Sequence, residues 1–417
     1  MQRFLLLAAI TSLALIASGG CNRAAVEAPK DDRQGLAIRI SPEGTDAAEP
    51  AIAGDGNGNM FVAYIEHSGD LADLYVQKYD ANGKISSDRV RVNPTAGEVK
   101  AWKGDPPTIA VGQDRTVYVG WTRAYTGPNA KGTNLVLSVS KNGGQTFDSP
   151  VKINDDEQPA SHGMHSMAID DKGRIFSAWL DERNIKFDGH APRPAGTEMH
   201  HDDAEPNSEV FYSVSEDGGK TFAANKKIAT GACPCCKTAV LAAADGTVYI
   251  SWRQVLKDNY RHIAVSHSND GGKTFTEGTI VSDDKWQLFA CPVAGAALAS
   301  SAPQKLDVVW YTAGSAGAPG MYLVKSSDSG KTFGSRMLID DKASASTPVV
   351  LTNAGKTTAL FTDTDLRIFA RSLEDPGASS SMITEGSVPA AIYSSGKLVT
   401  ALTRKANSKS EVWLISR

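Results

Sequence analysis

A short motif occurs four times along the chain and restricts the fold more than any other feature. Each copy has a Ser, an Asp or Asn two positions later, one or two Gly, and a closing Thr-Phe pair; the copies begin at Ser140, Ser215, Ser268 and Ser326. An Asp or Asn side chain can bond its own turn, and Gly takes positive φ freely, so each copy predicts a tight turn. Recurrence every 53 to 75 residues indicates a repeat architecture.

The motif resembles the Asp-box, Ser-x-Asp-x-Gly-x-Thr-Phe/Trp, of the sialidase-like β-propellers. The resemblance implies a structural role in the hairpins at the blade rim for four residues: Asn142, Asp217, Asp270 and Asp328. In that family the box lies far from the active site. The motif therefore predicts an all-β propeller with four-stranded blades, and it predicts no chemistry.

Apolar segments recur around the boxes in a constant order. The second segment of a unit ends in a bulky residue in four copies: Trp121, Trp179, Trp252 and Trp310. A third segment leads into the box and a fourth follows it, which is typical of a propeller blade. Degenerate units flank these four, so the count favours seven blades, with six as the alternative. Residues 36–40 are expected to pair with the C-terminal strand and close the last blade of the domain 35–417.

The N-terminus predicts export and anchoring rather than fold. Met1 to Arg3 is basic, residues 4–17 are apolar, and small residues precede Cys21, as in a secretory signal. The small-small-Cys ending resembles a bacterial lipobox with Ser18 in place of the usual Leu, which implies a lipid on Cys21; cleavage near Ala17 is the alternative. We expect a signal peptide over 1–20, a lipidated tether over 21–34, and a bacterial cell-envelope protein on the periplasmic or extracellular side of its membrane, the outer membrane in a Gram-negative cell.

Candidate ligand residues concentrate just before the first strands of consecutive units and in the long loop between the second and third strands of one unit, residues 184–208, and the topology places both at one mouth of the channel. The candidate metal ligands are His162, Met164, His165, Met167, His190, His200, His201, Cys233, Cys235, Cys236 and Cys291. Thiolate, thioether and imidazole suit Cu(I), or Zn in a Cys/His set. Alternatively, Cys291 forms a disulfide with one cysteine of the Cys-Pro-Cys-Cys segment, and the other two pair or stay free.

A second candidate site follows the second strands on the same face. Arg123, Arg183 and Arg253 could clamp a carboxylate, with Asp181 and Glu182 as acid, base or nucleophile for glycoside cleavage. The Arg-Ile-Pro signature of sialidases is absent, so no catalytic residue is assigned. Ion pairing between blades is the alternative for the arginines. Trp102, Trp286 and Tyr311 could border the mouth and stack on a sugar.

These patterns favour a lipid-anchored extracytoplasmic propeller that binds a ligand or a soft metal, Cu or Zn, through its Cys/His/Met face. An exo-α-sialidase-type glycoside hydrolase and a scaffold for an envelope protein are the alternatives, so the expected partners are the membrane, a small ligand, a glycan or an envelope protein. A net charge of −4 at pH 7 argues against nucleic acid.

Overall fold

The computed structural model describes residues 35–126, 131–185 and 207–417, and these residues form 28 β-strands and no α-helix. A 3-10 turn spans Lys257–Asn259. No helix among the described residues has the length and apolar character that crossing a membrane would need. Residues 1–34, which include the predicted signal and Cys21, lie outside the described part of the chain.

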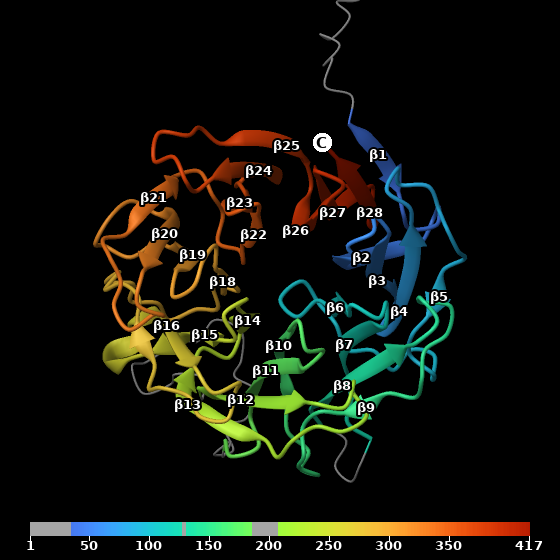
Figure 1. The fold of residues 1–417 in the computed structure, drawn as a ribbon, viewed down its shortest axis with the longest axis horizontal. Coiled ribbons are helices and arrows are strands. Elements are labelled where there is room, and N and C mark those ends of the chain that lie inside the picture. The colour runs from blue at the N-terminus through green and yellow to red at the C-terminus, as the bar shows by residue number, and fades with distance from the viewer. Residues whose placement is uncertain (1–34, 127–130, 186–206) are drawn as a thin grey trace, which may run out of the picture. The chain divides into compact units, whose positions relative to one another are not determined.

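Antiparallel sheets follow one another around a central axis in chain order, so residues 35–417 form a β-propeller (Figure 1). The first two sheets along the chain have four strands each. They are β2 (Asp46–Gly54), β3 (Met60–Ser68), β4 (Leu71–Tyr79) and β5 (Val90–Arg91), and then β6 (Thr108–Val111), β7 (Val117–Ala124), β8 (Thr133–Ser140) and β9 (Val151–Lys152). The third has eight strands: β10 (His162–Ile169), β11 (Ile175–Asp181), β12 (Ser208–Ser215), β13 (Lys226–Ala232), β14 (Ala239–Ala242), β15 (Val248–Val255), β16 (Arg261–Ser268) and β17 (Thr279–Ile280).

Three four-stranded sheets complete the ring. They are β18 (Ala296–Ala299), β19 (Leu306–Thr312), β20 (Gly320–Ser326) and β21 (Met337–Asp340); β22 (Val349–Asn353), β23 (Lys356–Thr362), β24 (Arg367–Ser372) and β25 (Ser381–Glu385); and β26 (Ser387–Ser394), β27 (Lys397–Ala406), β28 (Lys409–Ser416) and β1 (Leu36–Arg39). The eight-stranded sheet is joined in its middle by one pair, Ala232 with Gln254. Dividing the eight-stranded sheet at this pair gives two four-stranded units and seven units in all. The number of blades remains a prediction.

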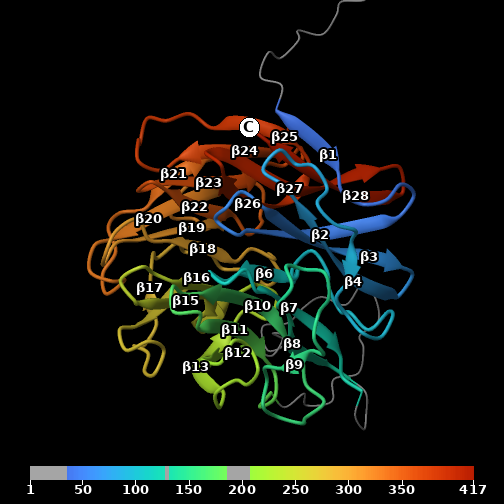
Figure 2. The same ribbon diagram turned by 45° about the vertical axis from the view of Figure 1, so that its right-hand side comes forward.

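The N-terminal strand completes the last sheet, as the sequence predicted. β1 pairs with β28 from Leu36–Ser416 to Arg39–Trp413, and the two strands lie side by side in both views (Figures 1 and 2). The ring is therefore closed by hydrogen bonds between the beginning and the end of the described chain.

The four tryptophans that end the second segments form the core between sheets. All four are almost fully buried, and each indole N–H has a polar partner. Trp179 donates to Asp181 at 2.8 Å and Trp310 donates to Asp284 at 2.7 Å, so a large apolar ring is buried without an unsatisfied donor.

The box turns form as predicted. Asp217 Oδ1 accepts hydrogen bonds from the backbone N–H groups of Lys220 and Thr221, both at 3.0 Å, and Oδ2 accepts one from Thr221 Oγ1 at 2.6 Å. Ser215 Oγ donates to Asp217 Oδ1 and accepts from the N–H of Gly219, both at 2.9 Å. The equivalent turn bonds recur at three further residues: Asn142, Asp270 and Asp328. Since each box joins the third strand to the fourth, it lies at the edge opposite the connections between sheets.

Candidate functional site

Three cysteine sulfurs meet in the connection between β13 and β14. The N–H of Cys233 donates to the carbonyl of Arg253 at 2.8 Å, and the N–H of Cys236 donates to the carbonyl of Cys233 at 3.3 Å. This tight turn places the Sγ atoms of Cys233, Cys235 and Cys236 within 4.8 Å of one another, and all three residues are buried. We call these three residues the cysteine cluster.

A disulfide links Cys235 of the cluster to Cys291, which precedes β18. The prediction that Cys291 pairs with one cysteine of the Cys-Pro-Cys-Cys segment is therefore confirmed. Cys235 is only 6% exposed, whereas Cys291 is an exposed residue. Cys233 and Cys236 remain thiols, with their Sγ atoms 3.4 Å apart.

One methionine of β10 packs against the cysteine cluster. The register of β10 against β11 shifts between Gly163 and Ser166, and Met164 has φ +52°, which is uncommon for a residue other than Gly. Thr238 holds this bulge, because its N–H and its Oγ1 both donate to the Met164 carbonyl at 3.0 Å. The bulge puts Met164 in the same buried cluster as the three cysteines.

Two buried arginines lie beside the cluster. Arg261 Nη1 donates to Cys233 Sγ at 3.1 Å, and Arg253 donates to the carbonyls of Arg261, Ala294 and Tyr311 at 2.7 to 3.5 Å. No carboxylate of the described residues forms an ion pair with either arginine. The donors of Arg253 are thus occupied by backbone oxygens of its own sheet (Arg261), of the next sheet (Tyr311) and of the connection between them (Ala294), which is a packing role. The positive charge of the two arginines therefore lies beside the sulfur atoms of the cysteine cluster.

The two thiols differ in acidity. The hydrogen bond with the Cys236 thiol, opposed by burial and aided by the charge of Arg261, lowers the pKa of Cys233 to about 6. Burial, together with the neighbouring Cys233, raises the pKa of Cys236 well above its ordinary value. Cys233 is therefore the more acidic thiol of the pair.

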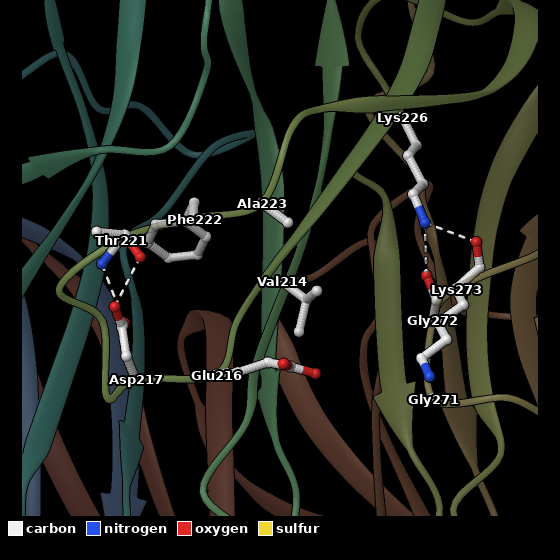
Figure 3. A pocket seen from close by; sticks show the side chains of 10 residues that line it. All are labelled: Val214, Glu216, Asp217, Thr221, Phe222, Ala223, Lys226, Gly271, Gly272 and Lys273. Carbon is white, nitrogen blue, oxygen red and sulfur yellow. Dashed lines mark hydrogen bonds between the residues drawn. The ribbon is translucent and has the colours of Figure 1, made fainter.

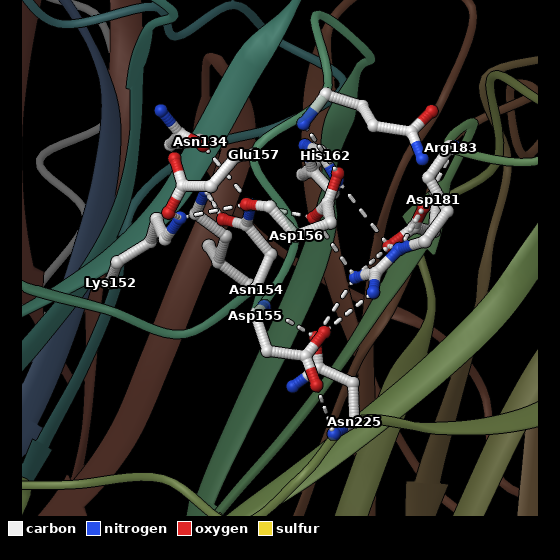
Figure 4. A network of polar contacts seen from close by, with 12 residues as sticks. Asn134, Lys152, Asn154, Asp155, Asp156, Glu157, His162, Asp181, Arg183 and Asn225 are labelled. Carbon is white, nitrogen blue, oxygen red and sulfur yellow. Dashed lines mark hydrogen bonds and ion pairs between the residues drawn. The ribbon is translucent and has the colours of Figure 1, made fainter.

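His162 lies in a separate polar network that joins β6–β9 to β10–β13 (Figure 4). Its Nδ1 lies 2.6 Å from the Thr133 carbonyl, and its Nε2 lies 3.0 Å from Asp156 and 3.6 Å from Asp181. Burial acts to lower the pKa of His162, but the bond to Asp156 and the charge of Asp181 outweigh it and raise that pKa.

Arg183 supplies the cation of the same network. It forms ion pairs with Asp155 at 2.6 Å, Asp156 at 3.3 Å and Asp181 at 2.8 Å, and its guanidinium stacks over the Phe211 ring. Asp181 also accepts the Trp179 indole N–H. Arg183, a candidate for a carboxylate clamp, and Asp181, a candidate for acid–base chemistry, are therefore engaged in a network that ties two sheets together.

His165 pairs with an aspartate that the sequence did not single out. Asp105 Oδ1 accepts the backbone N–H of His165 at 3.0 Å and lies 2.9 Å from its Nδ1. Burial acts to raise the pKa of Asp105, but the charge of His165 outweighs it and the pKa is lowered. Lys237 is the nearby cation: burial lowers its pKa to about 8, against the charge of Asp105.

The other candidates are dispersed. Met167 packs in a different apolar cluster, with Tyr118 and Ile175. Arg123 is half-buried opposite Asn134 in β8, and its guanidinium has no ion pair with the described residues. His190, His200 and His201 lie outside the described residues. Trp286 is buried beneath Arg253, with its ring edge against Tyr311.

A cavity of about 370 Å³ opens beside the cysteine cluster. Its lining combines polar and apolar side chains: Lys100, Ala101, Trp102, Asp105, Thr122, Thr133, Ser161, Gly163, Met164, Leu180, Glu182, Ser208 and Pro234. Trp102 is 41% exposed. Pro234 separates Cys233 from Cys235 in the chain, and Met164 belongs to the same buried apolar cluster as the cysteines, so the cavity reaches residues next to the cysteine cluster.

A second hollow, of about 440 Å³, lies between two successive box turns (Figure 3). Its polar groups are engaged in holding those turns: Asp217 bonds Thr221, and Lys226 Nζ donates to the carbonyls of Gly272 at 3.4 Å and Lys273 at 2.6 Å. These contacts therefore support the two box turns.

Sequence reasoning did not single out Arg261, Asp105 or Asp156. A repeated pattern, Val90-Arg-Val-Asn93 and Val151-Lys-Ile-Asn154, marks the asparagine two residues before Asp156 but not Asp156 itself. In both, the Asn side chain accepts the N–H of the adjacent third strand, at 2.8 Å from Leu74 and 3.1 Å from Leu135. No sequence pattern marked Arg261 as a partner of sulfur.

Comparison with known proteins supports the fold. No protein-family model matches the sequence, and a search of the curated proteins finds no match. Solved structures of similar fold include a protein of unknown function from Dyadobacter fermentans (TM-score 0.51, 14% identity, covering 91% of this chain and 97% of that one). Polysaccharide lyase Uly1 is similar with a TM-score of 0.54 and 13% identity, covering 88% of this chain and 89% of its own.

The Hadza microbial sialidase Hz136 is also similar, with a TM-score of 0.50 and 13% identity over 86% of this chain and 76% of that one. At these identities the likeness shows the fold alone.

Proposed function

We propose that the cysteine cluster binds a soft metal ion, Cu(I), and that this is the function of the Cys/Met face. The observation that carries the proposal is that three buried sulfurs lie within 4.8 Å of one another, with Met164 packed in the same cluster. Thiolate and thioether donors in an apolar pocket suit Cu(I). With Cys235 in a disulfide, Cys233 and Cys236 are the two thiolates available.

Copper fits the donor set better than zinc does. A structural Zn site almost always takes four ligands, usually from Cys and His. The two nearest histidines of β10, His162 and His165, are bonded to Asp156 and Asp105 rather than directed to the cluster. Two or three sulfur donors without a nitrogen therefore favour Cu(I), which accepts low coordination numbers.

The charge around the cluster supports the same proposal. A Cu(I) ion bound by two thiolates is a net anion, and burying an unpaired anion is costly. Arg261 contacts Cys233, and Arg253 lies against Arg261, with no carboxylate of the described chain to neutralise them. The arginine pair would offset the charge of the metal–thiolate group.

Titration of the anaerobic purified protein with Cu(I) against a chromophoric chelator tests the proposal. We expect one tightly bound ion, lost in Cys236→Ser. The two methionines of β10 supply a matched control: Met164→Leu is expected to weaken binding, and Met167→Leu, whose side chain packs elsewhere, to leave it unchanged. Absence of stoichiometric Cu(I) from protein whose Cys233 and Cys236 thiols are shown to be free by labelling would reject the function.

A glycan-binding or glycoside-cleaving role is the second candidate, because the exposed Trp102 lies at the cavity beside two carboxylates, Asp105 and Glu182. Aromatic faces stack on sugars, and paired carboxylates cleave glycosides. Release of a fluorophore from sialosides and other glycosides tests it. Activity that survives Glu182→Gln would remove that assignment, and no turnover of any glycoside would remove the class.

We also propose that the protein is tethered by a lipid on Cys21 in the bacterial cell envelope. Mass spectrometry of the N-terminal peptide from purified membranes tests the tether. Recovery of an unmodified Cys21 would contradict it.

A further inference from the structure

We propose that the Cys235–Cys291 disulfide is a redox gate on the copper site: a low-molecular-weight thiol attacks Cys291, and the released Cys235 becomes a third thiolate ligand. This inference rests on the proposed copper function and adds its regulation. It is carried by the position of one disulfide that joins a buried residue, Cys235, to an exposed one, Cys291.

The two ends of the disulfide differ in access. Cys291 is an exposed residue in the connection before β18, whereas Cys235 is 6% exposed and packed among Cys233, Cys236 and Met164. Thiol–disulfide exchange depends on which sulfur the attacking thiolate can reach. An external thiol therefore meets Cys291 first.

The exchange balances without any further reactant. The incoming thiolate R–S⁻ forms a bond to Cys291 Sγ as the Cys235–Cys291 bond breaks, and the electron pair of that bond leaves on Cys235 Sγ. The products are a mixed disulfide, R–S–S–Cys291, and a Cys235 thiolate. One S–S bond is broken and one is formed, so no net oxidant or reductant is consumed.

The sulfur of Cys235, which leaves in this exchange, already lies among the other sulfurs of the cysteine cluster. Cys235 Sγ lies 3.7 Å from Cys233 Sγ, and all three sulfurs lie within 4.8 Å of one another while the disulfide is intact. A disulfide sulfur carries no thiolate charge and is a poor ligand. Its release converts a two-thiolate site into a three-thiolate site without moving the chain.

The surroundings can accept the added charge. Arg261 and Arg253 are both buried beside the cluster, and the described residues contain no carboxylate paired with either one. A three-thiolate Cu(I) group has one more negative charge than a two-thiolate group, and two buried guanidinium groups match that count.

Two variants form a matched pair for the test. Cys291→Ser and Cys235→Ser both remove the same disulfide and the same 56-residue link, but only Cys291→Ser leaves a third thiol in the cluster. We expect Cys291→Ser to bind Cu(I) at least about 10-fold more tightly than Cys235→Ser, with three sulfurs rather than two around copper by X-ray absorption. Equal affinities in the two variants would overturn the gate while leaving the copper function intact.

The unmodified protein allows an independent experiment, which can be carried out even if both variants fold poorly. Glutathione is added anaerobically, the adduct is located by peptide mass spectrometry, and Cu(I) affinity is measured before and after. The expected result is an adduct on Cys291 and tighter copper binding. No reaction, an adduct on Cys235, or an adduct without a change in affinity would each overturn the gate; no Cu(I) binding in any form would instead reject the proposed function.

Discussion

The guanidinium of Arg261 lies 3.1 Å from the sulfur of Cys233 and has no carboxylate partner among the described residues. A buried cation stabilises the thiolate over the thiol, and Cys233 is the more acidic of the two free thiols among the described residues. The chemistry of the cluster therefore depends on a residue from β16 as well as on the cysteines themselves.

Replacing this arginine should raise the pKa of the Cys233 thiol. In Arg261→Met the apolar stem remains and the charge is lost, so we expect the pKa to rise from about 6 toward the ordinary thiol value. Thiolate absorbance or the rate of alkylation, followed against pH in metal-free protein, measures it. An unchanged thiol titration in a folded Arg261→Met variant would show that the Cys236 hydrogen bond alone sets the acidity.

Loss of the disulfide should destabilise the ring. The Cys235–Cys291 link closes a segment of 56 residues, for which chain entropy predicts about 4 kcal/mol. We expect Cys235→Ser and Cys291→Ser to lower the free energy of unfolding by similar amounts, measured by urea denaturation. A markedly larger loss in one variant would mean that its side chain has a packing role beyond the bond.

The His162 network should make stability depend on pH in a definite direction. The folded pKa of His162 is raised, so its stabilisation is fully present below the unfolded value of about 6.5 and is lost as pH rises through the folded value. His162→Asn should therefore cost more at pH 6 than at pH 9, by roughly 1–3 kcal/mol.

His262 offers the opposite sign as a control. Burial lowers its pKa, so its neutral form is favoured in the folded state and the wild-type side chain destabilises the protein as pH falls below about 6.5. His262→Asn should gain stability relative to wild type at low pH. Urea denaturation of both variants across this pH range measures the two trends, and parallel trends would contradict the assignment.

The two glycines of one box should tolerate substitution differently. A Cβ on Gly219 would lie 2.6 Å from Leu137 Cδ2, whereas one on Gly218 meets only Tyr118 Oη at 3.7 Å. Both residues have positive φ, and the fourth box already has Ser329 at the position of Gly218, with φ +64°. We expect Gly218→Ser to cost less than about 1 kcal/mol and Gly219→Ser about 2–3 kcal/mol in urea denaturation. Equal costs would mean that backbone strain, and not contact with Leu137, limits the position.

The sequence predicted those parts of the fold that local patterns determine. Box turns are made by residues within eight positions of one another, so Asp217 and Thr221 could be placed in advance. The buried position of Trp121 and its counterparts followed from alternation and recurrence. The closing pair of β1 and β28 followed from counting strands, because a propeller without it would leave two unpaired sheet edges.

The candidate site depended on long-range partners that no local pattern specifies. Four cysteines allowed several pairings, and only the fold selects Cys235 for Cys291. Met164 reaches the cluster through a bulge in which Met164 itself, and not a Gly, has positive φ, so the sequence does not mark the position. His162 and Arg183 share a network with Asp156, whose charge comes from the preceding unit, and sequence spacing alone could not distinguish this network from a ligand set.

The pairing of β1 with β28 also constrains how the molecule is made. Residues 36–39 are among the first of this unit to be synthesised, and their sheet partners, residues 413–416, are the last. The ring cannot be completed until residues 413–416 have left the ribosome, so the early sheets must persist with an open edge in the meantime. The final step of folding is then the meeting of the oldest and the newest strands, and a chain shortened by its last strand would remain an arc.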